Sequence, residues 1–273
     1  MKADLHVHST YSDGASSVLE VMSLAKQNGV THISFVDHDT VQGLEEIRRQ
    51  GDIHGIEVIP GIEISAYDFK RNRKVHVLGY NYHPDAVNIK ALCEPILERR
   101  NKHSLWQIEQ IRAAGYMLET QEIMESAKPS MAVYKQHIMQ HLTKESFSSE
   151  KYQTLYKQLF KQKGVAAGDI KYVDVFDAVN AIVADGGLAV VAHPGQLDSY
   201  DIIPELVDIG LSGIERNHMD HDLEDMQRVE SLAIKYRLFM TGGTDYHGSF
   251  GTAISIGDIT SPDMQMFCEY KLS

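Results

Sequence analysis

Short apolar segments alternate with amphipathic segments over roughly the first and the last 90 residues of the chain. The short segments are rich in β-branched residues and predict strands, whereas apolar residues spaced three or four apart predict helices. The predicted strands are Ala3–Val7, Ile33–Val36, Glu57–Ile62, Lys74–Tyr80, Leu188–Ala192, Gly213–Arg216 and Leu238–Thr241. This alternation predicts an α/β fold built on a parallel sheet or barrel, with one strand fewer than the usual eight.

The predicted helices between these strands begin and end at recognisable signals. Ser17 and Glu20 have the spacing of a capping box, which predicts a helix that runs through Asn28 and ends at Gly29. The other helices predicted in these parts of the chain are Val41–Gln50, Val175–Asp185, Ile202–Ile209 and Leu223–Tyr236.

The middle of the chain breaks the alternation. Residues 88–170 predict only amphipathic helices, at Leu97–Ala114, Thr120–Ala127, Met131–Leu142 and Ser149–Gln162. We therefore divide the chain into a first barrel part (1–87), an all-helical insertion (88–170) and a second barrel part (171–273). Because barrels carry their active sites at one end of the strands, we expect the insertion to form a lid over that end.

The composition narrows the classes of partner. A formal net charge of −12 disfavours a protein that coats long duplex nucleic acid. Small phosphorylated substrates remain possible, because divalent cations can reverse the local charge. Apolar runs are shorter than the ~20 residues that span a bilayer, and the first residues lack a secretory signal pattern, so we expect a cytoplasmic protein without a membrane contact. Cys93 and Cys268 are then expected to be reduced thiols.

Side chains that can bind metals recur at the ends of the predicted strands. In a strand, residues two apart face the same way, so His6 and His8 can contact one ion. A set of nitrogen and oxygen ligands without thiolates suits Mn, Fe or Zn. The candidate ligands, which are also the candidate catalytic residues, are His6, His8, Asp13, His38, Glu63, His76, His193, Asp245 and His247.

Each of these signals has another interpretation when it is taken alone. A single histidine such as His76 often only forms a hydrogen bond in the core, and His-x-His is a weak motif. Their recurrence at six strand ends favours a shared metal site. Asp4 and Asp39 could orient the rings of His6 and His38, and Asp39 could equally cap the helix that follows it.

The order of these residues resembles that of a known family. Asp4-Leu-His-Val-His-Ser, Asp37-His38-Asp39, Pro60-Gly-Ile-Glu63, Val75-His76, Ala192-His193-Pro194 and Gly243-Thr-Asp245-Tyr-His247 resemble the motifs of the polymerase and histidinol phosphatase (PHP) superfamily of metallo-phosphoesterases. The resemblance implies a distorted (β/α)7 barrel with a site for two or three divalent ions. It implies a first ion on His6, His8, Glu63 and Asp245, a second on Glu63, His76 and His193, and a third on Asp13, His38 and His247.

The helical insertion makes the chain similar to one subfamily, which includes nucleoside 3′,5′-bisphosphate phosphatases and 5′-to-3′ exoribonucleases. This resemblance implies an enzyme that hydrolyses phosphate esters of small nucleotides or short oligonucleotides, with a metal-bound hydroxide at a trinuclear site. Arg99 and Arg100 are adjacent here, whereas the subfamily has arginines about one helical turn apart. The candidate substrate-binding residues are Arg99, Arg100, Lys135, His137, Arg216 and His221.

Two other functions remain open on the sequence. One is a phosphatase of another metabolite, of the histidinol-phosphate type. The other is a non-catalytic domain that uses metal ions only for stability, which would show no turnover but a large stabilisation by metal.

Overall fold

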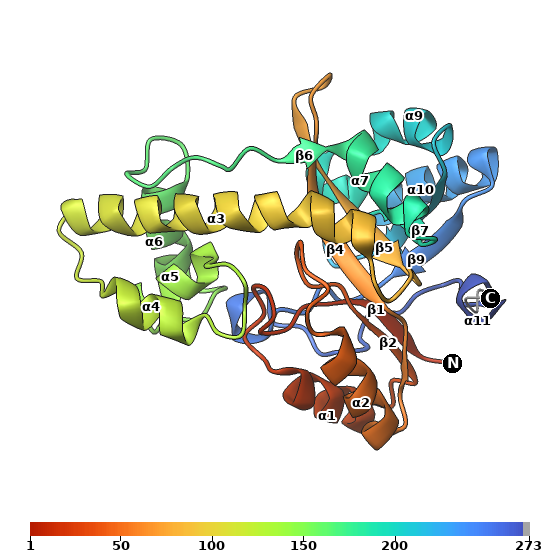
Figure 1. The fold of residues 1–273 in the computed structure, drawn as a ribbon, viewed down its shortest axis with the longest axis horizontal. Coiled ribbons are helices and arrows are strands. Elements are labelled where there is room, and N and C mark those ends of the chain that lie inside the picture. The colour runs from red at the N-terminus through yellow and green to blue at the C-terminus, as the bar shows by residue number, and fades with distance from the viewer. Residues whose placement is uncertain (270–273) are drawn as a thin grey trace.

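The computed structural model describes residues 1–269, with side chains to Phe267. Figure 1 shows strands covered by helices on the outside, with a long helix that extends away from them. The strands are β1 (Ala3–Val7), β2 (His32–Phe35), β3 (Glu57–Val58), β4 (Gly61–Asp68), β5 (Arg73–Tyr80), β6 (Val173–Asp174), β7 (Leu188–Val191), β8 (Leu211–Asn217) and β9 (Phe239–Gly242). The helices of six or more residues are α1 (Val18–Gln27), α2 (Leu44–His54), α3 (Val87–Ala113), α4 (Thr120–Ser126), α5 (Lys135–Leu142), α6 (Glu150–Phe160), α7 (Val175–Ala184) and α10 (Leu223–Tyr236).

Within residues 1–269 the strands form two sheets. The first has the order β1-β2-β3, and the second has the order β6-β4-β5-β7-β8-β9. Isolated bridges connect the sheets on both sides, between Val7 and Tyr246 and between His38 and Glu63. The predicted α/β class is thus confirmed, and the two bridges bring the end of β1 beside the end of β9 and the end of β2 beside β4.

The prediction of uniformly parallel strands was wrong for β5. This strand is antiparallel to both β4 and β7. A short turn joins β4 to β5, and Asn72 within it has a φ of 54°, so the chain reverses directly and not through a crossover helix. The predicted strand Glu57–Ile62 is also two strands, because Pro60 lies between β3 and β4 and has no N–H to donate.

Several predicted helix boundaries are found in the structure. The Ser17 hydroxyl accepts from the Glu20 N–H while the Glu20 carboxylate accepts from the Ser17 N–H, so the capping box is present, although Asn28 and not Gly29 caps the other end. Helix α10 has the predicted bounds. Helix α3 begins ten residues before the predicted start at Leu97 and continues through Pro95.

Helix α3 belongs to two hydrophobic cores. Its first half contributes Ile89, Cys93 and Ile96 to the core formed by the large sheet and α7. Its second half contributes Ile108 and Ile111 to a separate core shared with the helices that follow, α4, α5 and α6. The helical segment therefore buries its own apolar surface, and α3 connects it rigidly to the sheet.

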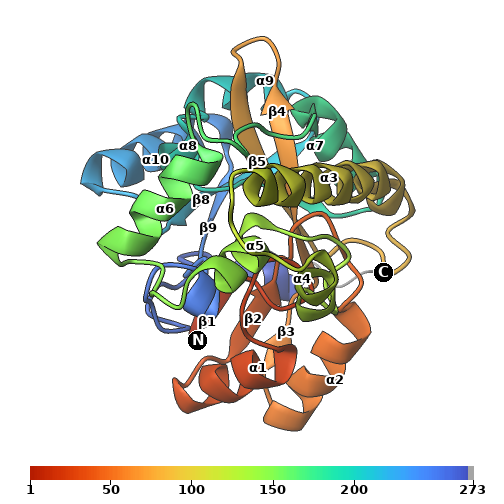
Figure 2. The same cartoon turned by 90° about the vertical axis from the view of Figure 1, so that its left-hand side faces the viewer.

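Helices α4, α5 and α6 lie in front of the strands when the molecule is viewed along α3 (Figure 2). This places the helical segment over one side of the strand assembly. In the part of the chain that the structure describes, we find no helix with the length and apolar character needed to cross a membrane. Cys93 is buried as a free thiol, whereas the side chain of Cys268 lies outside the described residues.

Candidate metal centre and active-site cavity

The structure brings all nine candidate ligands together. They form three overlapping groups in which the ligand atoms lie within 4.8 Å of one another, except that His193 joins through its contact with Glu63. The group that contains His6 is the set expected for the first ion. The group that contains Asp13 has the residues expected for the third ion and also His8. The groups are His6, His8, Glu63 and Asp245; His8, Asp13, His38 and His247; and His38, Glu63 and His76.

Glu63 lies at the centre of this constellation. Its side chain is 1% exposed and projects from β4 at the bridge to His38. One carboxylate oxygen, Oε1, is 2.7 Å from Nδ1 of His76 and 3.0 Å from Nε2 of His193. The other oxygen, Oε2, is 3.2 Å from Nε2 of His8, 3.3 Å from that of His6 and 3.5 Å from that of His38. A carboxylate with both oxygens shared in this way can bridge two ions.

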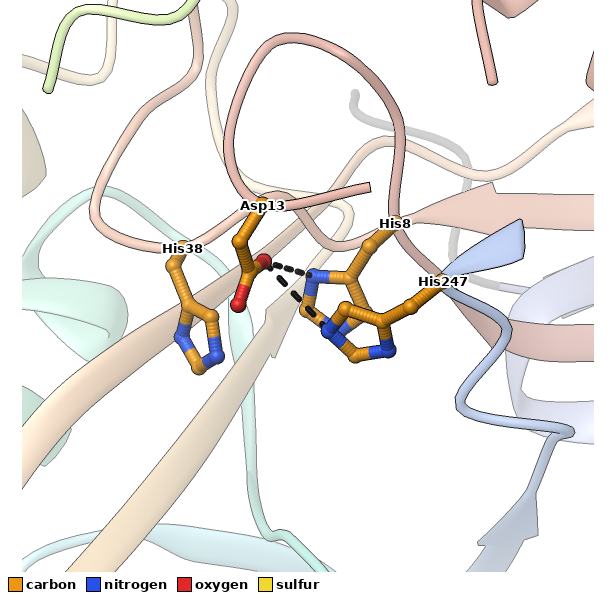
Figure 3. A group of neighbouring side chains, drawn as sticks. All are labelled: His8, Asp13, His38 and His247. Atoms are coloured by element: carbon orange, nitrogen blue, oxygen red, sulfur yellow. Dashed lines mark ion pairs between the residues drawn. The ribbon is translucent and has the colours of Figure 1, made fainter. Parts of the chain in front are cut away.

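Two aspartates from loops complete the centre. Oδ1 of Asp245 is 3.3 Å from Nε2 of His6 and 3.2 Å from that of His8. Figure 3 shows the second group, in which Oδ1 of Asp13 is 3.3 Å from Nε2 of His247 and 3.6 Å from Nδ1 of His8. The two ring nitrogens of His8 therefore face different carboxylates, so this residue lies between the two groups.

Unusual backbone conformations present some of these side chains. Asp245 has a φ of 50° and His193 a φ of 23°, both in the region that non-glycine residues rarely adopt. Such strain persists where the surrounding structure holds it, and it is frequent at functional sites. Asp37 holds the loop that carries Asp13, because its carboxylate accepts hydrogen bonds from the N–H and hydroxyl of Ser9 and from the hydroxyl of Ser12.

Two residues that support the centre were not among those predicted from the sequence. Glu215 in β8 is fully buried, accepts a hydrogen bond from Nδ1 of His6 at 2.9 Å and another from the His193 N–H at 2.8 Å. His218 lies just past the same strand, with Nε2 3.2 Å from Oδ2 of Asp245. Glu215 could have been recognised as a glutamate inside a predicted strand. Its neighbour Arg216 was predicted to bind substrate instead.

The expected roles of Asp4 and Asp39 were wrong. Asp4 accepts hydrogen bonds from the N–H and hydroxyl of Thr244, and so fixes the loop before Asp245 without contacting the His6 ring. Asp39 accepts from the Ser65 N–H at 2.8 Å and from Nη2 of Arg100 at 2.7 Å. It neither orients the His38 ring nor caps α2, whose N-cap is Gly43.

The carboxylates and imidazoles of the centre shift one another's pKa values strongly. Burial alone would lower the pKa of His8, yet the carboxylates of Asp245, Glu63 and Asp13 raise it to about 10. Burial lowers the pKa of His38 to about 4, so this imidazole is neutral at pH 7. Burial would raise the pKa of Glu63, but the surrounding imidazoles hold it well below its ordinary value.

The residues present fit metal ions. Nδ1 of His8, of His38 and of His193 is buried without a hydrogen-bond partner among the described residues, which is costly unless another group contacts it. All donors are imidazole nitrogens or carboxylate oxygens, the set that suits Mn, Fe or Zn.

A cavity of about 390 Å³ opens between this centre and the helical segment. Asp13, His38 and His76 line one part of it, and residues of α3, α5 and α6 line another. The Tyr134 hydroxyl donates to the His38 carbonyl at 3.1 Å, and the Gln136 amide donates to Asp13 at 3.1 Å. The helical segment thus contacts the loops that carry two candidate ligands.

The six candidate substrate-binding residues separate into two sets. Arg100 and Lys135 line the cavity. Arg216 binds Glu230 through Nε at 2.8 Å, on the opposite side of β8 from Glu215, since adjacent strand residues face opposite ways. Arg99, His137 and His221 also lie outside the cavity lining. Nδ1 of His137 accepts a hydrogen bond from the Tyr134 N–H, and Nε2 of His221 accepts one from the Gly195 N–H.

Residues 4–186 match the PHP domain family, and the chain belongs to this family. A phosphoribosyl 1,2-cyclic phosphate 1,2-diphosphodiesterase from Eggerthella lenta is 51% identical over 257 residues, which cover 94% of this chain and 98% of the relative. A 3′,5′-nucleoside bisphosphate phosphatase from Chromobacterium violaceum is 28% identical over 249 residues, which cover 89% and 86%.

A solved structure described as a metal-dependent phosphoesterase from Bifidobacterium adolescentis superposes with a TM-score of 0.86 at 22% identity, covering 96% of this chain and 92% of that one. This likeness supports the fold alone. The family match and the curated relatives establish the class of enzyme: the protein is a phosphoric ester hydrolase of the PHP domain family. The resemblance found in the sequence is thereby confirmed.

Proposed function

We propose that the protein is a phosphodiesterase that opens the cyclic phosphate of a phosphorylated ribose, with phosphoribosyl 1,2-cyclic phosphate as its substrate. One observation carries the proposal. The chain is 51% identical, over nearly its full length, to a relative named for this activity, and its cavity has candidate metal ligands at one part and cationic side chains at another. Such a cavity suits a sugar that carries two phosphates.

We propose that the nine clustered residues hold two or three divalent ions, the predicted trinuclear site. The two groups that share His8 would hold one ion each, and Glu63, His76 and His193 would complete another position. Bound ions of this kind activate water for attack and neutralise charge on phosphoryl oxygens. Hydrolysis adds a water oxygen to phosphorus and breaks one bond from phosphorus to a sugar oxygen, which leaves with a proton.

The chain's own residues position the ester for this reaction. The buried centre faces the cavity through Asp13, His38 and His76, so the cyclic phosphate would lie against these residues. Arg100 lines the same cavity, and Asp39 and Ser65 fix its guanidinium, since Nη2 lies 2.7 Å from Asp39 and 3.0 Å from the Ser65 hydroxyl. A guanidinium held in this way can hydrogen-bond phosphoryl or sugar oxygens without further ordering.

We also propose that the two linked sheets act as a distorted barrel and that α3–α6 form its lid. Support comes from the two bridges between the sheets and from the contacts of Tyr134 and Gln136 with the ligand loops. Closure by these helices would exclude water other than the attacking molecule.

A second candidate is hydrolysis of nucleoside 3′,5′-bisphosphates or short oligonucleotides, the function expected from the sequence. The relative with bisphosphate phosphatase activity in its name supports it, at 28% identity. The two candidate reactions would use the same metal centre. They differ in which part of the substrate, apart from the sugar, the cavity must hold.

A substrate panel separates them. Purified protein loaded with Mn²⁺ would be assayed against phosphoribosyl 1,2-cyclic phosphate, adenosine 3′,5′-bisphosphate, a short 5′-phosphorylated RNA and histidinol phosphate, with ³¹P NMR to follow each ester. We expect the highest kcat/KM with the cyclic phosphate. A higher kcat/KM with the bisphosphate or the RNA would establish the second candidate, and one with histidinol phosphate would overturn both.

A further inference from the structure

Two lysines on the cavity wall share a single carboxylate. Nζ of Lys74 lies 2.8 Å from Oδ2 of Asp169, and Nζ of Lys135 lies 3.4 Å from Oδ1 of the same residue. The lysines come from β5 and α5, and Asp169 comes from the segment between α6 and β6. All three line the cavity that the candidate metal ligands also line.

The surroundings of this group differ from those of a solvated surface ion pair. The side chains of Lys135 and Lys74 are only 22% and 33% exposed. The Lys74 ammonium lies 5.2 Å from the centre of the Tyr172 ring, and Lys161 is a further cation on the cavity wall. Asp169 is the more exposed member at 43%, so it can leave toward solvent while the lysines stay in place.

The site lies at a suitable distance from the metal centre. Lys74 and His76 are two residues apart in β5 and therefore face the same side of the strand, about 6.7 Å apart along it. A phosphorylated sugar could thus place one phosphate at the candidate metal ligands and another at the lysines.

We propose that Lys74 and Lys135 form a phosphate subsite, and that the Asp169 carboxylate occupies this subsite in the absence of ligand and is displaced by the second phosphate of the substrate. The carboxylate offers one negative charge and two oxygens, whereas a phosphomonoester offers close to two charges and three oxygens. Exchange of one for the other is therefore favourable for a ligand with a second phosphate and unfavourable for one without it. The identity of that ligand rests on the proposed function, but the subsite does not.

The Asp169 carboxylate would then act as an internal competitor that makes binding selective for ligands with a second phosphate. A ligand that lacks the second phosphate leaves Asp169 in place and gains nothing from the two lysines. Asp169 also keeps the lysines paired between turnovers, so that inorganic phosphate and other small anions compete weakly for the cavity.

Phosphate binding to metal-free protein tests the subsite directly, because the ions cannot then contribute. Chelator-treated wild-type protein and Asp169→Asn would be titrated with inorganic phosphate by calorimetry. We expect Asp169→Asn to bind phosphate about ten-fold more tightly, the size expected for one charge-assisted contact freed from its competitor. Equal or weaker binding by a folded Asp169→Asn overturns the proposal.

Four further variants keep the test decisive. Asp169→Glu retains the carboxylate and is expected to bind phosphate as wild type does, and Glu145→Gln, which removes an exposed partner of Lys151, is expected to leave binding unchanged. Lys74→Gln combined with Lys135→Gln is expected to abolish the gain in the Asp169→Asn background, and retention of the gain would overturn the subsite. If Asp169→Asn melts early, Asp169→Ser provides the same comparison.

Kinetics distinguish this proposal from the proposed function. Asp169→Asn is expected to lower KM for a substrate with a second phosphate and to leave KM unchanged for ribose 1,2-cyclic phosphate, which lacks it. Hydrolysis of neither compound by the wild type would overturn the proposed function, while phosphate binding would still decide the subsite. Efficient hydrolysis with unchanged phosphate binding in Asp169→Asn would overturn the subsite alone.

Discussion

Glu215 and His6 form a fully buried pair in which the carboxylate accepts a hydrogen bond from Nδ1 of the imidazole at 2.9 Å. With Nδ1 acting as the donor, Nε2 of His6 is left to face Glu63 and Asp245, each 3.3 Å away. The same Glu215 carboxylate accepts from the His193 N–H. One glutamate therefore fixes the tautomer of one candidate ligand and the backbone of another.

We predict that Glu215→Gln weakens metal binding. The amide keeps the shape of the side chain but loses the charge that stabilises the Nδ1-protonated ring, and loss of such partners typically costs about 10–100-fold in metal affinity or activity. Competition with a chelator, read by elemental analysis, would measure it. Glu230→Gln, which affects the Arg216 pair, is the matched control and should retain wild-type affinity. Wild-type metal affinity in Glu215→Gln would contradict the role.

A second prediction concerns pH and the metal-free centre. The folded-state pKa of His8 is raised to about 10 from an ordinary 6.5, so its proton stabilises the metal-free fold below about pH 6.5 and this contribution disappears as the pH rises toward 10. Metal-free protein should therefore lose stability over that range. Metal-loaded protein should not, because the ion takes the place of the proton and metal affinity rises with pH.

Urea unfolding at several pH values, with and without Mn²⁺, would measure this difference. Parallel stability curves for the two forms would contradict it.

Exhaustive chelation should also abolish turnover, and Mn²⁺ should restore it. Activity that survives removal of all transition ions would contradict the assignment of the centre.

The third prediction concerns His137, which the sequence analysis assigned to substrate. Burial lowers its pKa to about 4, so the neutral ring stabilises the fold above about pH 6.5 and this contribution is lost as the pH falls toward 4. His137→Asn keeps an acceptor for the Tyr134 N–H but does not titrate. We expect the wild type to lose more stability than His137→Asn between pH 6.5 and 4, with similar kcat and KM at pH 7.5. An identical acid dependence would exclude this effect.

A fourth prediction separates Arg100 from Arg216. Arg100→Gln, combined with Asp39→Asn so that no buried carboxylate is left unpaired, should raise KM for the best substrate about ten-fold, because a charge-assisted contact is lost. Arg216→Gln should leave kcat and KM within about two-fold of wild type, since its partners are Glu230 and Asn217. The reverse ranking would place the substrate on the other side of β8.

The sequence predicted which candidate ligands cluster better than it predicted the residues that support them. His6 and His8 share a face because strand side chains alternate. Most of the other candidate ligands follow a strand closely in the sequence, whereas Glu63 and His76 lie within β4 and β5. Glu215 was missed because its importance depends on contacts with residues 209 and 22 positions away in the chain. The same alternation shows why Arg216, its neighbour, points elsewhere.

The fold was predicted where local signals decide it. The capping box of α1 and the bounds of α4 follow from short-range patterns. The direction of β5 does not, because a parallel and an antiparallel strand have the same composition and only the short turn before it separates them. The pairing of Asp169 with Lys74, nearly a hundred residues away, was equally beyond a local pattern.

The separation of His6 from His247 along the chain has a consequence for biosynthesis. The two histidines belong to groups that share His8, so the constellation needs residues from near both ends of the polypeptide. A nascent chain halted before residue 245 lacks one member of each of these two groups, Asp245 in one and His247 in the other. We therefore expect the complete constellation to form only after β9 and the loop that follows it have been synthesised.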